Sequence, residues 1–373
     1  MNLAVLKDSD VAENRVALIP THVEKLTKLG ALVFVEKDLG KNLNLTDSHY
    51  EKAGAKVLDR KDLINQADIV VRIRRPNVDE VKDLKKGSIH ISFLDPFNEK
   101  EILSKFREAN VSGVSLEMIP RTTKAQKMDV LSSQASLAGY SAVILAQNHL
   151  PQIFPMMMTP AGTLGPSRVF IIGAGVAGLQ AIATAKRLGA RVNAFDTRPV
   201  VEEQVKSLGA KFVKLDLGET GQTSGGYANA LTEEQLNKQR QLMKKHCQES
   251  DVVITTAQVF GRKAPVIVTK DMIEVMRPGS VVVDLAVETG GNVEGVELGK
   301  IVERHGVKLI GLPNLAGMVN VHASQMLSSN IFHLIEEFWN KEKKILEMNL
   351  DNEILKGCLI THQGQIVHPL FKS

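Results

Sequence analysis

The chain has 373 residues, of which 43% are hydrophobic and 24% charged, and its net charge is +4 at pH 7. These values are typical of a globular protein long enough for two domains, and they exclude a disordered chain. The charge is small and Lys and Arg alternate with Asp and Glu, which argues against nucleic-acid binding.

Cys247 and Cys358 stand far apart and in no metal-ligand spacing. We therefore expect no metal site and no disulfide framework, and a reducing compartment fits. The N-terminus has no signal-peptide pattern, and no run approaches the roughly 20 apolar residues that span a bilayer. We expect a soluble chain, so that any function at a membrane would fall to a partner.

Strand and helix patterns alternate along the first part of the chain. Helices are expected at PTHVEKLTKLG (20–30) and early in RKDLINQADIVVRIRRP (60–76). Strands are expected at LAVLK (3–7), ALVFVE (31–36), late in 60–76, and at GSIHISF (87–93). This alternation predicts a parallel sheet with helical crossovers.

A second series of this kind begins near Ser167 and ends near Gly311. Its expected strands are RVFIIGA (168–174), RVNAFD (191–196), KFVKL (211–215), DVVITTA (251–257), SVVVDLA (280–286) and VKLIG (307–311). A long helix, QMLSSNIFHLIEEFWNKEKKIL (325–346), and a hairpin, GCLITHQGQIVHP (357–369), follow. We predict an α/β protein with two Rossmann-like domains, each with a parallel sheet. The first contains residues 1–130 and about 320–373, and the second contains residues 135–315.

A glycine fingerprint opens the second series. In VFIIGAGVAGLQAIATAKRLGARVNAFD, Gly173-x-Gly175-x-x-Gly178 follows an apolar strand and precedes a helix from about Val176 to Leu188. The next strand ends in Asp196, about 20 residues beyond the glycines, as in dinucleotide-binding folds. The helix N-terminus then offers N–H groups and a positive dipole end to phosphates. Asp196 favours NAD(H), because its carboxylate would repel a 2′-phosphate.

Arg198 leaves the cofactor preference less sharp, since an arginine could pair with a phosphate or simply face solvent. Further strand ends should contribute to the same site, with Thr255, Thr256 and Ala257, then a loop through Pro265 and Ile267, and lastly Glu288, Gly290 and Gly291. The segment ETGQTSGGYANALTEEQ (219–235) is either a mobile lid over the nucleotide or an ordinary exposed loop. The predicted cofactor-binding residues are Gly173, Ala174, Gly175, Val176, Gly178, Asp196, Thr197, Arg198, Gly226, Tyr227, Ala257 and Ile267.

A polar stretch, EMIPRTTKAQKMDVLSSQASLAGY (117–140), lies ahead of the fingerprint. From the residues alone it is either a connector between domains or a group of side chains that orients a cofactor. Its polar side chains are Arg121, Gln126, Asp129, Ser132 and Ser133.

Several motifs together resemble the NAD(H)-binding component of proton-translocating nicotinamide nucleotide transhydrogenases. They are ENRVALIP, MIPRTTKAQKMDVLSSQASLAGY, FPMMMTPAGT, GAGVAGLQAIATAKRLGA, EQVKSLGAKF, RPGSVVVDLAVETGGN and QIVHP, and they cover essentially the whole chain. Alanine dehydrogenases share this fold and are the alternative.

The resemblance implies a subunit that binds NAD(H) in the cleft between its domains. A second component would bind NADP(H), and a membrane component would translocate protons. It also implies a homodimer at the inner face of the membrane, attached through its partner subunits. Within this family the stretch with Arg121, Gln126, Asp129 and Ser132 surrounds the nicotinamide and its ribose, so these are the predicted catalytic residues.

Alanine dehydrogenase activity is the less favoured prediction. Arg15 matches an arginine of that family, but Arg72, Arg74 and Arg75 stand where its substrate-binding lysine is expected. Ser92 aligns with the catalytic histidine, with His90 two residues earlier, and Glu288 aligns with the catalytic aspartate. A nucleotide-binding module without turnover of its own is a third possibility. For Met156 to Met158, packing in the core is expected rather than a docking surface.

Overall fold

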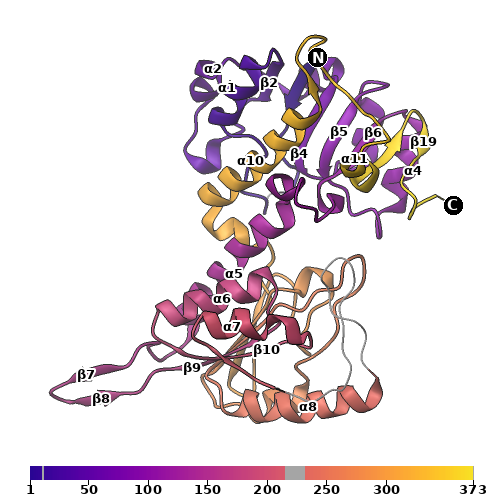
Figure 1. The fold of residues 1–373 in the computed structure, drawn as a ribbon. Helices are drawn as coiled ribbons and strands as arrows, with labels where there is room; N and C mark the ends of the chain where they lie inside the picture. Colours follow the sequence, from indigo (N-terminus) through magenta and orange to yellow (C-terminus); the bar gives the residue numbers. More distant parts are fainter. Residues whose placement is uncertain (11, 215–231, 373) are drawn as a thin grey trace. The chain divides into compact units, whose positions relative to one another are not determined.

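The computed structural model describes residues 1–10, 12–214 and 232–372. The chain divides into two compact units, which contain residues 1–134 with 319–373 and residues 135–318. The boundary between residues 134 and 135 falls within helix α5 (Val130–His149). Figure 1 shows the strands and helices of both units.

The first unit is built on an eight-stranded sheet, in the order β19-β18-β6-β5-β4-β1-β2-β3. Its strands are β1 (Asn2–Val5), β2 (Leu32–Glu36), β3 (Lys56–Leu58), β4 (Ile69–Arg74), β5 (Ile89–Phe93), β6 (Ser112–Ser115), β18 (Leu359–His362) and β19 (Gln365–Ile366). Strands β1 to β6 run parallel, and β18 joins β6 antiparallel. The strand order reverses between β1 and β4, which is the doubly wound arrangement.

The helices of this unit come from both ends of the chain. They are α1 (Pro20–Lys28), α2 (Asp47–Lys52), α3 (Arg60–Gln66), α4 (Lys100–Glu108), α10 (Asn320–Phe338) and α11 (Glu353–Cys358). The C-terminal segment contributes Leu327, Ile331 and Ile335 of α10 to the same apolar core as Leu3 and Val5 of β1. The C-terminal residues therefore complete the first unit.

Helix α10 is shorter than the sequence pattern predicts. It ends at Phe338, and Trp339 begins a short hairpin of β16 (Trp339–Asn340) and β17 (Ile345–Leu346). The indole N–H of Trp339 donates to the carbonyl of Leu29 at 2.9 Å, and this buried anchor turns the chain out of the helix. The hairpin predicted at residues 357–369 is confirmed, because β18 and β19 pair antiparallel.

The second unit contains a seven-stranded sheet in the order β11-β10-β9-β12-β13-β15-β14. Its strands are β9 (Arg168–Ile172), β10 (Arg191–Phe195), β11 (Lys211–Phe212), β12 (Val252–Thr255), β13 (Val281–Asp284), β14 (Ile301–Arg304) and β15 (Val307–Ile310). All of these strands are parallel except β14, which pairs antiparallel with β15. This edge strand was not predicted. The order again reverses, here between β9 and β12.

Both faces of this sheet are buried. Val169 and Ile171 of β9 belong to one apolar cluster, whereas Phe170 and Ile172 belong to another. Successive side chains of a strand point to opposite faces, so the two clusters lie on opposite sides of the sheet. Helix α6 (Val176–Arg187) and α7 (Glu202–Ser207) contribute to the first cluster, and α8 (Glu233–Gln248) and α9 (Lys270–Ile273) contribute to the second.

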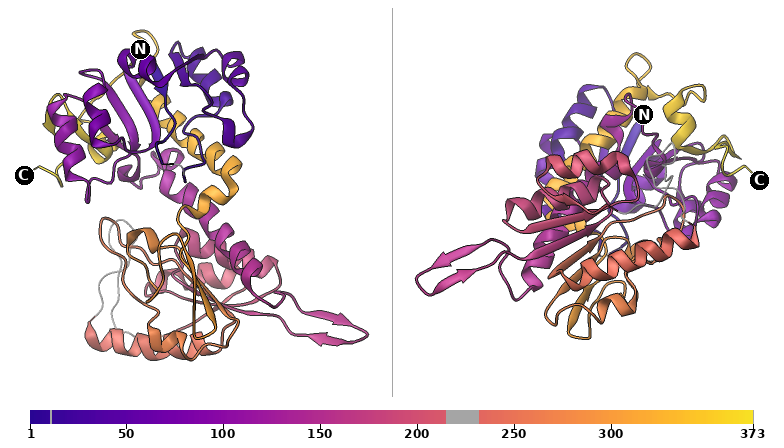
Figure 2. Two further views of the ribbon diagram at one scale, coloured as in Figure 1. Left: turned by 180° about the vertical axis from the view of Figure 1, so that it is seen from behind. Right: turned by 60° about the horizontal axis from the view of Figure 1, so that its bottom comes forward.

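A further hairpin, β7 (Met157–Thr159) and β8 (Gly162–Leu164), extends away from this sheet (Figure 2). The side chains of Met156, Met157 and Met158 are 59%, 45% and 73% exposed. The prediction that these methionines pack in the core is therefore wrong. A hairpin with only two strands has no second layer to bury its side chains.

Together, the two doubly wound units confirm the predicted fold class. No helix within the described residues is long and apolar enough to span a membrane.

Candidate nucleotide site

The glycine loop lies at the carboxyl end of β9, where the sheet order reverses. Gly173 has a φ of +99°, and a Cβ atom on it would lie 2.5 Å from Thr256 Oγ1. A Cβ atom on Gly178 would lie 1.9 Å from the carbonyl oxygen of Gly173. The tight turn and the close approach of helix and strand therefore both require glycine, as the fingerprint predicts.

Gly175 differs from the other two glycines because the space beside it is open. The nearest atom to a Cβ atom there would be Arg198 Nη2, at 4.0 Å. Gly175 is also the N-cap of α6, whose first residues are Val176 and Ala177. The first N–H groups of a helix have no partners within the helix, so this open approach leads to anion-binding donors.

Asp196 follows β10 and joins the glycine loop to the next turn. Its Oδ2 accepts a hydrogen bond from Ala174 N at 2.7 Å, and its Oδ1 accepts one from Arg198 N at 2.9 Å. The Arg198 guanidinium donates to both oxygens, through Nε at 2.9 Å and Nη2 at 2.8 Å. The carboxylate oxygens thus already hold four hydrogen bonds from the chain. Half-buried Thr197 lies between these two residues.

Arg198 does not face solvent, since its side chain is only 14% exposed and paired with Asp196. That alternative from the sequence is wrong. The hydrogen bonds and charge of Asp196 raise the pKa of Arg198, although burial opposes this. A ribose hydroxyl or a phosphate that reaches this position must therefore exchange with an existing ion pair.

The end of β12 lies beside the glycine loop. Thr256 Oγ1 donates to the carbonyl of Gly173 at 3.1 Å, and the hydroxyl of Thr255 donates to Asp284 Oδ1 at 3.1 Å. Half-buried Ala257 and Ile267 follow in a loop that is hydrogen-bonded to Asn292. The sequence analysis missed Asp284 and Asn292, although each directly adjoins a predicted feature, at the end of SVVVD and after the glycine pair of ETGGN.

The remaining predicted residues of this unit have less definite places. Glu288 is exposed and accepts a hydrogen bond from Asn314 N at 3.1 Å, and Gly290 and Gly291 have φ values of +106° and +83°. Gly226 and Tyr227, with most of the expected lid, lie outside the described residues.

The polar stretch of the first unit leads into helix α5. Arg121 and Gln126 are exposed, and Gln126 lies in a single 3-10 turn (Gln126–Met128). Asp129 precedes α5, and its carboxylate accepts hydrogen bonds from Ser132 N at 2.9 Å and from Ser132 Oγ at 2.6 Å. This is the capping arrangement that satisfies N–H groups at a helix start. Asp129 and Ser132 are thus held as a pair, whereas the amide of Gln126 reaches solvent.

Helix α10 anchors this stretch through side-chain hydrogen bonds. Asn330 accepts a hydrogen bond from Ser133 Oγ at 2.7 Å and donates to the carbonyl of Lys127 at 2.7 Å. Gln134 donates to the carbonyl of Ala323 at 3.0 Å. Asn330 was not predicted, because about 200 residues separate it from its partners.

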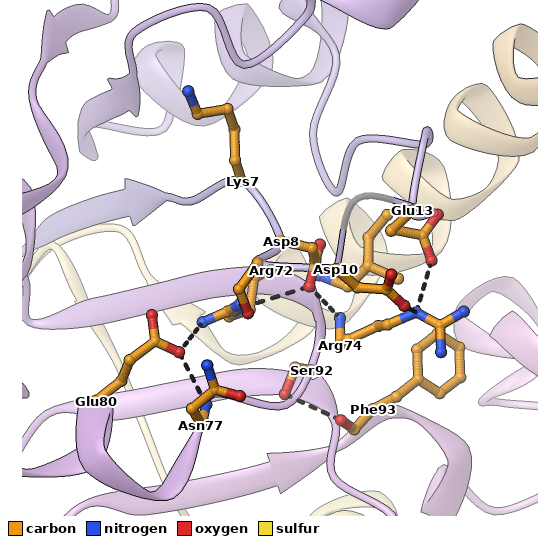
Figure 3. Close-up of polar contacts among 12 residues, drawn as sticks. Lys7, Asp8, Asp10, Glu13, Arg72, Arg74, Asn77, Glu80, Ser92 and Phe93 are labelled. Carbon is orange, nitrogen blue, oxygen red and sulfur yellow. Dashed lines mark hydrogen bonds and ion pairs between the residues drawn. The ribbon is translucent and has the colours of Figure 1, made fainter.

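The residues that would bind a carboxylate substrate in an alanine dehydrogenase are paired with acidic side chains. Glu13, which has no exposed side-chain surface, accepts from Arg15 Nε at 2.7 Å, from Arg15 Nη2 at 2.6 Å and from Arg74 Nε at 3.1 Å. Burial acts to raise the pKa of Glu13, but the hydrogen bonds and charge of Arg15 outweigh it and lower that pKa. Figure 3 shows Glu13 and Arg74 in this arrangement. Arg15 therefore pairs as expected of a structural residue.

Arg72 lies in a second buried group at the carboxyl end of β4. Its guanidinium pairs with Glu80 at 3.1 Å and with Asp8 at 3.5 Å, and its side chain is 1% exposed (Figure 3). Arg75 pairs with Glu99. The cations that replace the expected lysine are thus neutralised by carboxylates.

His90 and Ser92 of β5 are both buried. Neither ring nitrogen of His90 has a hydrogen-bond partner among the described residues, and its ring packs against Phe106 at a centroid distance of 5.2 Å. Burial, with a smaller contribution from Arg72, lowers the pKa of His90 to about 3. The hydroxyl of Ser92 donates to the carbonyl of Phe93 at 3.3 Å (Figure 3). This geometry favours the structural interpretation of His90.

Two family models match nearly the whole chain. The model described as alanine dehydrogenase/PNT, N-terminal domain, matches residues 4–138, and the model described as alanine dehydrogenase/PNT, C-terminal domain, matches residues 142–369. The family resemblance inferred from the motifs is therefore confirmed.

Individual relatives separate the two branches of this family. The first of the parts that make up NAD(P) transhydrogenase subunit alpha in Rhodospirillum rubrum is 42% identical over 377 residues, which cover 99% of this chain and 98% of the relative. A solved structure of transhydrogenase from Sinorhizobium meliloti is 42% identical, covers 100% of both chains and has a TM-score of 0.87. A solved L-alanine dehydrogenase is 25% identical, covers 100% of this chain and 98% of that chain, and has a TM-score of 0.83. The chain is closer to these transhydrogenases.

Proposed function

The chain belongs to the alanine dehydrogenase/PNT family, and on that premise we propose that it is the NAD(H)-binding subunit of a proton-translocating NAD(P)+ transhydrogenase. The observation that carries the proposal is the glycine loop at the reversal of the second sheet, with Asp196 at the next strand end. It occurs in a chain whose 42%-identical relative carries the name of a transhydrogenase subunit along its full length. The enzyme would turn over only together with its partner subunits.

The second unit would hold the adenosine and pyrophosphate end of the cofactor. The open approach beside Gly175 leads to the first N–H groups of α6, which suit a pyrophosphate. Adenosine ribose hydroxyls would replace the Arg198 guanidinium on the Asp196 oxygens, and the displaced guanidinium would remain near the phosphates. The negative charge of Asp196 supports NAD(H) over NADP(H), because it would repel a 2′-phosphate.

The polar stretch of the first unit would hold the nicotinamide end. The exposed amide of Gln126 can pair with the carboxamide, and the guanidinium of Arg121 can reach ribose or phosphate oxygens. The fixed pair of Asp129 and Ser132 offers hydroxyl and carboxylate oxygens at the start of α5. When bound, the nicotinamide supplies the carbon that gives or accepts hydride. These residues need only position it, because hydride transfer between two nicotinamides requires no acid or base at the reacting carbons.

Such a reaction depends on alignment, with the reacting carbons about 3–3.5 Å apart. The second nicotinamide would belong to NADP(H) on a partner component, and a membrane component would couple the transfer to proton movement. We propose a homodimer that is cytoplasmic and attached to the inner face of the membrane through these partners.

The ion pairs of the first unit argue against an alanine dehydrogenase. Glu13 already occupies the guanidinium of Arg15, and Arg74 shares the same carboxylate. A substrate carboxylate would have to displace this buried pair. His90 lies inside the sheet with a pKa of about 3, which does not suit a proton carrier at neutral pH.

Reconstitution tests the proposal. The purified chain is mixed with the NADP(H)-binding component of a transhydrogenase, and the reduction of an NAD analogue by NADPH is followed. The chain alone, with NADH, pyruvate and ammonium, is the parallel assay. Turnover only in the mixture supports a subunit that needs its partner. Reduction of pyruvate by the chain alone would refute the proposal and establish an alanine dehydrogenase.

A further inference from the structure

Asn292 is a buried side chain that joins separate parts of the second unit. It has no exposed surface, and its Nδ2 donates to the carbonyls of Ala257 and Pro265, both at 2.8 Å. Its Oδ1 accepts from Ala257 N at 3.0 Å. Its backbone carbonyl accepts from the N–H groups of Ile267 at 2.8 Å and Val268 at 2.9 Å. One residue therefore holds both ends of the 257–267 loop.

This loop depends on such a contact because it contains no helix or strand. Its backbone groups have no ladder to pair with, and two of its apolar side chains, Phe260 and Val266, are 37% and 52% exposed. Little burial of these side chains is available to fix the loop. An asparagine suits the task, since its amide can donate to two carbonyls and accept from an N–H at once.

Asp284 orients Asn292 from the end of β13. Its Oδ2 accepts from Asn292 N at 2.7 Å and from Val293 N at 3.2 Å. Its Oδ1 accepts from Ala286 N at 2.8 Å and from Thr255 Oγ1 at 3.1 Å. The carboxylate is buried and its oxygens are used by the chain, so Asp284 is placed to organise backbone rather than to contact a ligand.

The same hydrogen bonds continue to the glycine loop. Ala257, held by Asn292, directly follows Thr256, whose hydroxyl donates to the carbonyl of Gly173 at 3.1 Å. The N–H of Thr256 donates to the carbonyl of Ile172 at 2.9 Å. A connected path therefore runs from the end of β13, through the end of β12, to the turn at the end of β9.

We propose that Asn292, oriented by Asp284, is a positioning residue of the NAD(H) site. It acts through Ala257 and Ile267, whose loop it fixes at the carboxyl edge of the sheet beside Gly173. This inference rests on the proposed function, because it requires that the carboxyl edge bind NAD(H). It assigns to Asn292 a role in affinity for NAD(H) that is separate from its contribution to stability.

The test compares Asn292→Ala and Asn292→Ser with a matched control, Ser167→Ala. Alanine removes all side-chain hydrogen bonds of Asn292, whereas the serine hydroxyl can replace one of them. Ser167 is 2% exposed and donates to the carbonyl of Ile153 at 2.7 Å, but it precedes β9 and so lies at the opposite edge of the sheet. Each full-length variant is measured for thermal stability and, by calorimetry, for NADH affinity. The reconstituted assay then gives KM for the NAD analogue and for NADPH.

We expect Asn292→Ala to weaken NADH binding by about tenfold or more, since three buried backbone groups lose their partner. Asn292→Ser should fall between this variant and the parent chain. The KM for the NAD analogue should rise, and that for NADPH, which binds the partner component, should not change. Ser167→Ala should lose stability and keep its NADH affinity.

Parental NADH affinity in Asn292→Ala, together with lower stability, would overturn the proposal and leave Asn292 a structural residue. Equal losses of affinity in Asn292→Ala and Ser167→Ala would overturn it as well. If Asn292→Ala does not fold, Asn292→Ser decides by the same criteria. A parent chain that does not bind NADH refutes the proposed function itself, and this is seen before any variant is compared.

Discussion

Replacing Asp196 with alanine should weaken NADH binding. The Asp196 carboxylate holds Ala174 N at 2.7 Å and the Arg198 guanidinium at 2.8 and 2.9 Å. In the proposed complex the adenosine ribose hydroxyls take over the acceptor positions of the arginine, and the variant offers them none. A donor left without an acceptor in a desolvated site costs about 1–3 kcal/mol, which corresponds to an affinity loss of about 5- to 160-fold.

Calorimetric titration with NADH measures this loss, and Asp251→Ala is the matched control. Asp251 is 4% exposed, accepts a hydrogen bond from Arg168 N at 2.8 Å and pairs with Arg277 at 3.4 Å. It immediately precedes β12 and therefore lies at the amino edge of the same sheet, away from the glycine loop. Both variants should lose thermal stability, but only Asp196→Ala should lose affinity for NADH.

Either of two results would refute this reasoning. Parental affinity in Asp196→Ala would mean that the ribose is held by other residues. Similar losses of affinity in Asp196→Ala and Asp251→Ala would mean that a weakened sheet, rather than a missing ribose acceptor, is responsible.

Three other variants test separate parts of the structure. Gln126→Asn should leave thermal stability unchanged but slow hydride transfer in the reconstituted assay by more than about tenfold, because the shorter side chain loses its reach; an unchanged rate would remove Gln126 from the site. Gly178→Ala should lower the free energy of unfolding by about 1–3 kcal/mol or more, because its Cβ would meet Gly173 O at 1.9 Å, whereas Gly175→Ala meets open space and should unfold like the parent. The pKa of buried His90 is lowered to about 3, so the unfolded chain binds this proton more readily and stability falls as pH drops below about 6.5. His90→Leu should therefore lose about 2 kcal/mol less than the parent between pH 7 and pH 5; denaturant titrations at both pH values measure this, and equal losses would contradict it.

Local pattern was sufficient to predict most of the fold. Strands β9, β12 and β13 are uninterrupted apolar runs, as expected for parallel strands buried on both faces. The misses lie where a tertiary contact overrides the local pattern. The helical periodicity continues past Phe338, but the hydrogen bond from Trp339 to Leu29 ends the helix. The expected strand at 211–215 is reduced to β11, and edge strand β14 was not predicted at all.

The candidate site was predicted unevenly for the same reason. Gly173 and Gly178 belong to a short contiguous motif whose steric demands are local, so their structural roles could be predicted. Asn292 and Asn330 could not be, because their partners lie 27 to 35 and about 200 residues away in the chain. An asparagine in a loop looks alike in sequence whether it is solvated or holds several backbone groups.

The sequence by itself thus determined the α/β class, the glycine turn and the family, because each depends on periodicity, on local backbone geometry or on the order of short motifs. Only the tertiary structure showed that Arg198 covers Asp196, that Glu13 neutralises Arg15 and Arg74, and that Asn292 holds the loop beside the glycine turn. Those contacts are between hydrogen-bonding and charged groups whose partners depend on how the chain folds back on itself. A charged side chain carries the same letter whether it is open to a ligand or already paired, and the geometry of the fold decides which of the two it is.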